Sequence, residues 1–393
     1  PDHIASSMVG QVMGLPVFEK HSKERAGALM DYFRYARDND IYMTYVIINP
    51  QADRNKSVGE HDDEFLATGV VDEDAEGITV RGAKMLGTGS IMANEVLFAN
   101  IQPLKPGEEK YAISFAIPMN TKGLKVMSRK SYEESATSSF DYPLSARYDE
   151  NDALVYCDDV KVPWDRVFIY KDTETARGQF QDTYAHYMQN YQAMTRLMVK
   201  MQFQVGVARR MCETIGTIGI PSVAEKLGHM AAQAAMVEGL VYGMESGGGM
   251  FNGYYVPDRN LMYTAQVLTQ QLYPEFITSM RELAGGGLIM LPSSAEDFTD
   301  PDLNRYINAT QKSAIGTAEE KVKFMKLAWD CIGSEFASRH TQYEMFYAGA
   351  QFVTRGHAMR TYDWERSSDL VDSILDKYSL SDTIGSGDKL AAE

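Results

Sequence analysis

The hydropathy pattern changes twice along the chain, and these changes limit the folds that it can adopt. Residues 20–39 place apolar side chains at three- and four-residue intervals, which predicts an amphipathic helix near the start of the chain. Between residues 65 and 170 the pattern becomes a series of short β-rich runs separated by turns such as DEDAEG and NTKG. Long helical patterns follow from about residue 173 to residue 348. Because strands and helices do not alternate, the order is not that of a doubly wound parallel sheet.

We therefore predict an α+β fold with helices first, a β-domain in the middle and a helical bundle at the end. The predicted parts are a helical segment at 1–60, a β-domain of about seven strands at 61–169, a bundle of four long helices at 170–348 and a tail at 349–393. Ser222 and Thr317 are each followed three residues later by a glutamate, and both are expected to close capping boxes at helix starts.

Composition limits the partners and the location of the protein. The 38 Lys and Arg residues against 54 Asp and Glu residues leave a net charge of −16, which disfavours binding to nucleic acid or to anionic membranes. No apolar run approaches the ~20 residues needed to cross a bilayer, and no leader pattern opens the sequence. We therefore expect a cytoplasmic protein. Its three cysteines, Cys157, Cys212 and Cys331, are far apart and odd in number, which favours buried thiols over disulfides.

Several common catalytic signatures do not occur. The segment Gly87-Thr88-Gly89-Ser90 begins like a dinucleotide-binding loop, but Met92 stands where the third glycine belongs. There is no GxxxxGK[ST] loop and no GxSxG elbow. The seven histidines form no HExxH motif or close pair, so we predict no metal site.

Three polar clusters remain as candidate binding segments. They are INPQADR at 48–54, GAKMLGTGS at 82–90 and the hydroxyl-rich stretch ESATSSFDYPLSARYDEND at 134–152. Each combines polar side chains with neighbouring apolar residues, as ligand-binding loops do. Taken singly, each is equally typical of an ordinary turn or a solvated connection.

The order of the clusters resembles that of known flavoenzymes. VRGAKMLGTGSIMANEVLFANI and LVYCDDVKVPWDRVFIY resemble the middle β-domain of the acyl-CoA dehydrogenase fold. NPQADR, FDYPLSARYDENDA, DDVKVPWDRVFIYKD, GGLIMLPSSAEDF and KLAWDCIGSEFASRHTQYEMFYAG are similar to segments of the oxygenase component of 4-hydroxyphenylacetate 3-monooxygenase and its relatives. The resemblance covers nearly the whole chain. It implies an acyl-CoA dehydrogenase-like subunit with truncated N-terminal helices, a middle β-barrel domain and a C-terminal four-helix bundle.

The resemblance also implies an activity. Such an oxygenase component receives reduced FAD from a separate NAD(P)H-dependent flavin reductase and uses O₂ to hydroxylate a para-substituted phenol at its ortho carbon, giving a catechol. The leading candidate substrate is 4-hydroxyphenylacetate. The subunit must exclude water, hold the phenol ring and favour its phenolate form. Family members are typically homotetramers, and the many apolar faces of the predicted bundle favour the same assembly.

The matching motif positions imply where the ligands bind. His3 and Tyr45 stand where the family usually carries a tyrosine and a histidine, and we expect both to hydrogen-bond the phenol oxygen as the catalytic pair. The residues expected to meet the far end of the substrate are Ser135, Ala136, Thr137 and Ser138. The residues expected to contact FAD are Tyr45, Val46, Ile47, Ile48, Gln51, Thr88, Tyr347, Ala348, Gly349 and Ala350.

Two other classes stay open. The sequence also resembles 4-hydroxybutyryl-CoA dehydratase, but that enzyme needs an iron–sulfur cluster held by three cysteines and a histidine. Here the cysteines are scattered, and the helical segment 184–206 carries His186 without a cysteine. The other possibility is an acyl-CoA-type flavoenzyme or a catalytically silent subunit with the same fold.

Overall fold

Three helices form the start of the chain in the computed structural model, which describes residues 2–380. They are α1 (Asp2–Met13), α2 (Leu15–His21) and α3 (Lys23–Asp38). The Ser22 side chain accepts a hydrogen bond from the Arg25 backbone N–H, which caps α3, and Ala26 and Leu29 are buried on its apolar face. The predicted helix over 20–39 is therefore confirmed from residue 23, because Ser22 ends one helix and starts the next.

The β-domain consists of two four-stranded sheets. The first has the order β1 (Met43–Val46), β4 (Glu95–Phe98), β5 (Ile113–Pro118) and β8 (Val167–Tyr170). The second has the order β2 (Gly69–Glu73), β3 (Gly77–Lys84), β7 (Ala153–Pro163) and β6 (Leu124–Ser128). β1 runs parallel to β4, and the other pairs in both sheets are antiparallel.

The two sheets of the β-domain share one apolar core. Side chains from both sheets, among them Val46, Ile78, Phe115 and Val155, pack in a single buried cluster. Within residues 2–380, a bridge between Ile48 and Met85 joins the two sheets beyond the ends of β1 and β3, and no ladder is found that closes them into the predicted barrel. Alternating apolar residues predict the strands, whereas closure depends on pairing between distant strands, which has no local signal.

The helical bundle has a core built from four long helices. These are α6 (Ala185–Ile215), α7 (Pro221–Ser246), α8 (Arg259–Ala284) and α10 (Ala318–Ile332). Thr317 closes the predicted capping box with Glu320 at the start of α10. The box predicted at Ser222 is wrong, since α7 begins at Pro221 and its cap residue is Ile220. Proline at the first helical position has its φ angle preset for the helix and no N–H to satisfy, so α7 starts without a capping side chain.

Shorter elements complete the described part of the chain. They are α4 (Ser145–Tyr148), α5 (Thr173–Gln181), β9 (Gly249–Phe251), β10 (Tyr254–Val256), α9 (Pro301–Thr310), α11 (Glu335–Phe346), α12 (Gln351–Thr361) and α13 (Trp364–Leu375). Of the predicted tail at 349–393, residues 381–393 lie outside the described residues. None of the helices within residues 2–380 is long and apolar enough to cross a membrane.

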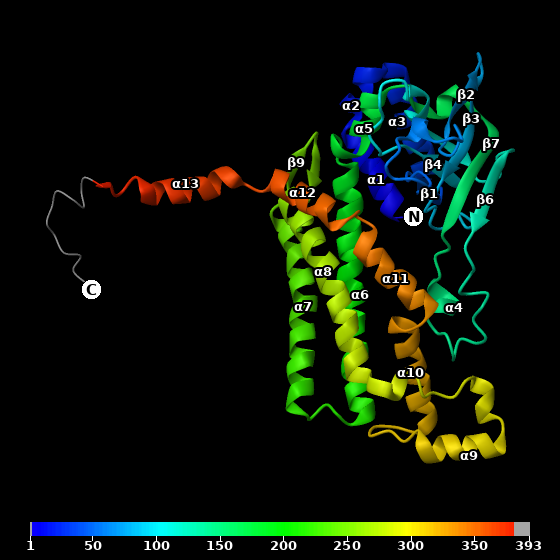
Figure 1. The fold of residues 1–393 in the computed structure, drawn as a ribbon, viewed down its shortest axis with the longest axis vertical. Coiled ribbons are helices and arrows are strands. Elements are labelled where there is room, and N and C mark those ends of the chain that lie inside the picture. Colours follow the sequence, from blue (N-terminus) through cyan, green and yellow to red (C-terminus); the bar gives the residue numbers. More distant parts are fainter. Residues whose placement is uncertain (1, 381–393) are drawn as a thin grey trace.

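The N-terminal helices and the sheets pack beside the bundle. Figure 1 shows the bundle helices along the long axis of the molecule, with α1 against α6 near one end and α11 between the bundle and the β-domain. α13 extends away from the body. This arrangement brings α1, β1, α6 and α11 together at the boundary of the three parts.

Candidate active site

His3 of α1 and Tyr45 of β1 form a hydrogen-bonded pair at this boundary. Their rings stack with centroids 5.8 Å apart, and His3 Nε2 lies 3.3 Å from the Tyr45 hydroxyl. The structure thus brings together the two residues that were predicted to act on the phenol oxygen. They are 42 positions apart in the chain.

Gln192 of α6 determines which nitrogen of His3 carries the proton. Its amide Nε2 donates to the Asp2 carboxylate at 2.7 Å, so its Oε1 faces His3 Nδ1 at 3.2 Å. An amide oxygen can only accept, which places the His3 hydrogen on Nδ1. Neutral His3 therefore presents a bare Nε2, and the Tyr45 hydroxyl donates to it.

Both members of the pair stay uncharged at neutral pH. Burial, assisted by the positive charge of Arg196, lowers the pKa of His3 from 6.5 to about 4. Burial raises the pKa of Tyr45 above its ordinary value of 10, and the neighbouring Tyr343 acts in the same direction. The pair is thus a neutral acceptor and a neutral donor, suited to positioning a hydroxyl group.

A buried ion cluster between α6 and α11 lies next to this pair. The Glu344 side chain is 1% exposed and binds Lys200 at 2.6 Å and Arg196 at 3.2 Å. Burial alone would raise the pKa of Glu344, but the two cations lower it below its ordinary value. The Arg196 guanidinium lies over the Tyr343 ring, 4.5 Å from its centroid. Of the charges that act on His3, the positive charge of Arg196 outweighs the Asp2 carboxylate on the far side of Gln192.

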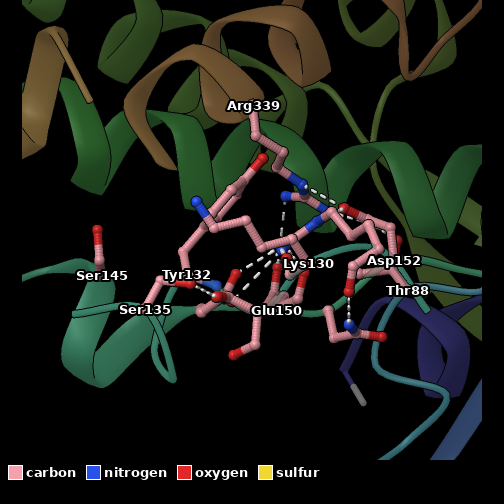
Figure 2. Close-up of polar contacts among 12 residues, drawn as sticks. Thr88, Lys130, Tyr132, Ser135, Ser145, Glu150, Asp152 and Arg339 are labelled. Carbon is pink, nitrogen blue, oxygen red and sulfur yellow. Dashed lines mark hydrogen bonds and ion pairs between the residues drawn. The ribbon is translucent and has the colours of Figure 1, made fainter. Parts of the chain in front are cut away.

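Thr88 is tied to α11 through a second ionic network. Its hydroxyl donates to Asp152 Oδ1 at 2.7 Å, and the same carboxylate binds Arg339 at 2.6 and 2.9 Å. Arg129 donates to the other carboxylate oxygen, Oδ2, at 3.0 Å. Figure 2 shows Arg339 reaching down from its helix to Asp152, with Thr88 beside that carboxylate. Although burial opposes ionisation, Arg339, Thr88 and Arg129 lower the pKa of Asp152.

The hydroxyl-rich loop starts at the same network. Arg129 lies where this loop begins and ends, and it donates a hydrogen bond to Asp149 at 2.7 Å. The Arg129 guanidinium lies 4.1 Å from the centroid of the Tyr132 ring. Among the predicted substrate residues, Ser135 and Ser138 donate within the loop, to the Ser131 carbonyl at 2.7 Å and to Asp141 at 2.6 Å. The other two predicted residues are the half-buried Ala136 and the exposed Thr137.

Tyr347 supplies an unpaired polar atom. Its hydroxyl is buried and makes no hydrogen bond within residues 2–380, and its ring stacks on Tyr343 at 5.0 Å. Ala348 and Gly349 follow it, and the Gly349 carbonyl accepts from Gln270 at 2.8 Å. Ala350 is the N-cap residue of α12. Because a buried hydroxyl without a partner is costly, this position fits a bound polar ligand.

The first predicted flavin segment is divided between core and surface. Val46 is fully buried between the sheets, and Ile47 packs against Ala99, Phe180 and Ala185. Ile48 pairs with Met85, next to the loop that carries Thr88. Gln51 is exposed, and its side chain accepts a hydrogen bond from Arg54 within the same loop. The backbone of 46–48 thus reaches the Thr88 loop, whereas Gln51 belongs to a surface turn.

Several residues of this region were not singled out from the sequence. They are Gln192, Arg196, Lys200, Asp152, Arg339, His340 and Glu344. In the SRHTQYEMFY segment of α11, Arg339, Tyr343 and Tyr347 recur at four-residue spacing, which places them on one helix face. Polar side chains repeated on one face of a helix beside an apolar core are the signal that could have indicated them.

The fold is that of the acyl-CoA dehydrogenases. A glutaryl-CoA dehydrogenase structure aligns with a TM-score of 0.52 at 12% identity, covering 89% of this chain and 74% of that one. A 4-hydroxybutyryl-CoA dehydratase from N. maritimus aligns with a TM-score of 0.82 at 20% identity, covering 95% and 75%, and this likeness shows the fold alone. Here Cys157 lies in the sheet core, whereas Cys212 and Cys331 lie in the bundle core.

Within this fold, the chain belongs to the 4-hydroxyphenylacetate 3-hydroxylase family. The N-terminal model of that family matches residues 1–169, and its C-terminal model matches residues 176–376. A crystal structure of the oxygenase component (HpaB) of 4-hydroxyphenylacetate 3-monooxygenase, complexed with FAD and 4-hydroxyphenylacetate, aligns with a TM-score of 0.89 at 32% identity. It covers 96% of this chain and 78% of that one.

Curated relatives give the same family. The 4-hydroxyphenylacetate 3-monooxygenase oxygenase component of Pseudomonas aeruginosa is 34% identical over 84% of this chain and 64% of its own length. The Thermus thermophilus protein of that name is 35% identical, over 86% and 70%. The oxygenase component of 4-nitrophenol 2-monooxygenase from Rhodococcus is 33% identical, over 84% and 64%. The chain therefore spans about two thirds of the length of these relatives.

Proposed function

We propose that this protein is the oxygenase component of a two-component monooxygenase that converts a para-substituted phenol into a catechol. The observation that carries the proposal is the neutral His3–Tyr45 pair, fixed in one hydrogen-bonding direction by Gln192 at the boundary of the three parts of the fold. Family membership supports the same reaction, and 4-hydroxyphenylacetate is the leading candidate substrate.

The hydrogen-bond direction gives the pair a defined role toward a phenol. Because the Tyr45 hydrogen points to His3 Nε2, the Tyr45 oxygen can accept a hydrogen bond from the substrate hydroxyl. Because burial and Arg196 hold the pKa of His3 at about 4, His3 is a poor acceptor for the phenol proton, and the pair orients the phenol hydroxyl rather than removing its proton. The positive charge of Arg196 favours phenolate character at the bound phenol oxygen, which makes its ortho carbon the better nucleophile.

The polar groups of this region also fit FAD. The unpaired hydroxyl of Tyr347 and the Thr88 oxygen can bond the polar edge of a flavin ring, and the backbone of 46–48 can lie along it. Bound reduced FAD would supply the two electrons that the reduction of O₂ requires. The protein's own task is to keep water away from the site and to hold the phenol ring in place.

The partners follow from the same proposal. A separate NAD(P)H-dependent flavin reductase supplies reduced FAD, in keeping with the component names of the relatives. The acidic net charge of −16 disfavours nucleic acid and membrane partners, and we place the protein in the cytoplasm.

We further propose a homotetramer. α13 projects from the body (Figure 1), and its residues include none that is buried in the chain. Its exposed apolar residues are Trp364, Leu370, Val371, Ile374 and Leu375. An amphipathic helix of this kind is stabilised when another subunit covers its apolar face. Sedimentation should give about four times the 44.0 kDa chain mass, and a monomer would contradict the assembly.

A panel of phenols tests the reaction. The protein is mixed anaerobically with photoreduced FAD and each phenol, then exposed to O₂, and catechol and hydrogen peroxide are quantified. We expect at least one para-substituted phenol to give catechol in preference to peroxide. If every phenol yields peroxide only, while an acyl thioester is turned over, the proposed reaction is wrong and an acyl-CoA-type activity replaces it.

A further inference from the structure

The hydroxyl of Thr88 has its single hydrogen committed to Asp152. The Thr88 Oγ1 and Asp152 Oδ1 atoms lie 2.7 Å apart. Arg339 binds both oxygens of the carboxylate, and Arg129 binds one of them, so Asp152 is ionised and carries no hydrogen. In this bond the carboxylate can only accept, and Thr88 must donate.

The surroundings prevent Thr88 from changing this direction. The Asp152 carboxylate receives four hydrogen bonds, two from Arg339 and one each from Arg129 and Thr88. The Thr88 backbone is fixed as well, since its carbonyl accepts from the Thr44 hydroxyl at 2.7 Å and its N–H bonds the Leu86 carbonyl at 2.9 Å. Only the lone pairs of the Thr88 hydroxyl remain available for a further hydrogen bond, so this group acts toward a ligand as an acceptor.

Whether the flavin ring can donate a hydrogen bond to such an acceptor depends on its redox state. Oxidised flavin has a bare N5 atom, which accepts hydrogen bonds. Reduction by two electrons and two protons converts N5 into an N–H donor. A hydroxyl that can only accept forms a hydrogen bond with the N5–H of the reduced ring. With the oxidised ring its lone pair faces the lone pair of N5, and both groups stay unpaired, which is costly in a buried site.

We propose that Asp152 is a positioning residue that makes the Thr88 loop selective for reduced FAD. It acts by holding the hydroxyl hydrogen of Thr88, which leaves only the oxygen lone pairs to meet the N5–H of the reduced ring. The inference rests on the proposed function, since it requires that FAD binds at this loop. It goes beyond that function by assigning the choice between the two redox states to one carboxylate outside the flavin contact itself.

Dissociation constants for reduced and oxidised FAD test the proposal without any turnover. Both are measured anaerobically, by fluorescence or absorbance titration, on the wild type and on Thr88→Val, Asp152→Asn and Thr88→Ser. The wild type should bind reduced FAD more tightly. Thr88→Val should lower this preference about tenfold, the effect of one hydrogen bond. Asp152→Asn should lower it by strengthening the binding of oxidised FAD, because an amide can donate to Thr88 and release its hydrogen. Thr88→Ser should keep the preference.

Two controls separate this effect from general loss of structure. Thr88→Val leaves the contacts of Asp152 with Arg339 and Arg129 in place, so a wild-type preference in this variant overturns the proposal even if Asp152→Asn does not fold. Asp159→Asn makes the same change in an exposed carboxylate that binds Arg81 through two hydrogen bonds, and it should leave the preference unchanged.

The outcomes distinguish the two proposals. If the wild type binds both redox states equally, or if either Thr88→Val or Asp152→Asn binds FAD with the wild-type preference, the role of Asp152 is overturned and the proposed function stands. If the wild type binds FAD in neither state, the proposed function is wrong and the inference falls with it.

Discussion

Arg339 and Asp152 are 187 positions apart in the chain, and two hydrogen bonds join them, from Nε to Oδ2 at 2.9 Å and from Nη2 to Oδ1 at 2.6 Å. This contact ties α11, which lies between the bundle and the β-domain, to the residue that precedes β7 in the second sheet. Thr88 bonds the same carboxylate, so α11, the second sheet and the Thr88 loop meet at one group.

Replacing Arg339 should therefore destabilise the whole chain. The side chains of Arg339 and Asp152 are only 12% and 20% exposed, so Arg339→Ala leaves a largely buried carboxylate with one cation fewer. We expect a loss of about 2–3 kcal/mol in the free energy of unfolding. Urea denaturation measures it. Lys130→Ala is the control, because the ion pair of Lys130 with Glu335 is exposed and should contribute little. Equal effects of the two variants would contradict this reading.

Lys84 should make stability depend on pH in the alkaline range. Lys84 is 2% exposed, and its ammonium bonds two amide oxygens, those of Asn49 at 2.6 Å and Asn100 at 3.2 Å, and no carboxylate among residues 2–380. Burial lowers the pKa of Lys84 from 10.5 to about 7. Between these values the unfolded chain binds more protons than the folded one, so this residue makes the fold more stable as pH rises.

The lowered pKa of Lys84 sets how much its titration changes the free energy of unfolding. From about pH 7 to about pH 9 the contribution amounts to about 2 kcal/mol. It should disappear in Lys84→Met and persist in Lys161→Met, whose side chain is 38% exposed and paired with Asp74. Urea denaturation at the two pH values measures the difference. An unchanged slope in Lys84→Met would show that Lys84 is charged in the folded protein.

A carboxylate in place of the Gln192 amide should raise the pKa of His3. At present burial and Arg196 hold the pKa of His3 at about 4, and the Gln192 oxygen accepts from Nδ1. In Gln192→Glu a negative charge replaces that oxygen, so the pKa of His3 should rise by at least one unit. NMR titration of the imidazole measures the change, and Gln192→Leu, which adds no charge, should not raise it. A pKa that stays near 4 in Gln192→Glu would contradict the geometry.

Removing the Tyr45 hydroxyl should affect the reaction more than the fold. Tyr45→Phe deletes the group that donates to His3 Nε2 and would accept from the phenol. With the proposed reaction, kcat/KM for the phenol should fall about tenfold or more. Tyr148→Phe, at an exposed position, is the matched control. Wild-type kcat/KM in Tyr45→Phe would exclude this hydroxyl from the site.

Local patterns in the sequence predict the elements of the fold well. The capping box at Thr317 and the helix that starts near Ser22 involve residues within a few positions of each other, and both are found. The box at Ser222 fails because Pro221 begins that helix in another way. The barrel that the family resemblance implies depends on pairing between distant strands, and no ladder that closes the two sheets is found within residues 2–380.

The chemistry of the site was less accessible from sequence. His3 and Tyr45 were chosen from motif positions, and the structure brings them into contact. Their direction of hydrogen bonding depends on Gln192, which lies 189 positions from His3 and carries no local signal. The same holds for Arg339 and Asp152. Ion pairs and tautomers of this kind are set by tertiary contacts, which single-sequence patterns do not encode.

Incorporation of labelled oxygen shows whether the protein is a monooxygenase. The wild-type protein is given reduced FAD, the phenol that the panel shows to be turned over and ¹⁸O₂ in unlabelled water, and the product is analysed by mass spectrometry. We predict a catechol with one ¹⁸O atom, in its new hydroxyl group, since a monooxygenase inserts one atom of O₂ and reduces the other to water. A catechol whose new oxygen comes from water, or a reaction that forms only hydrogen peroxide with every phenol, would contradict the account.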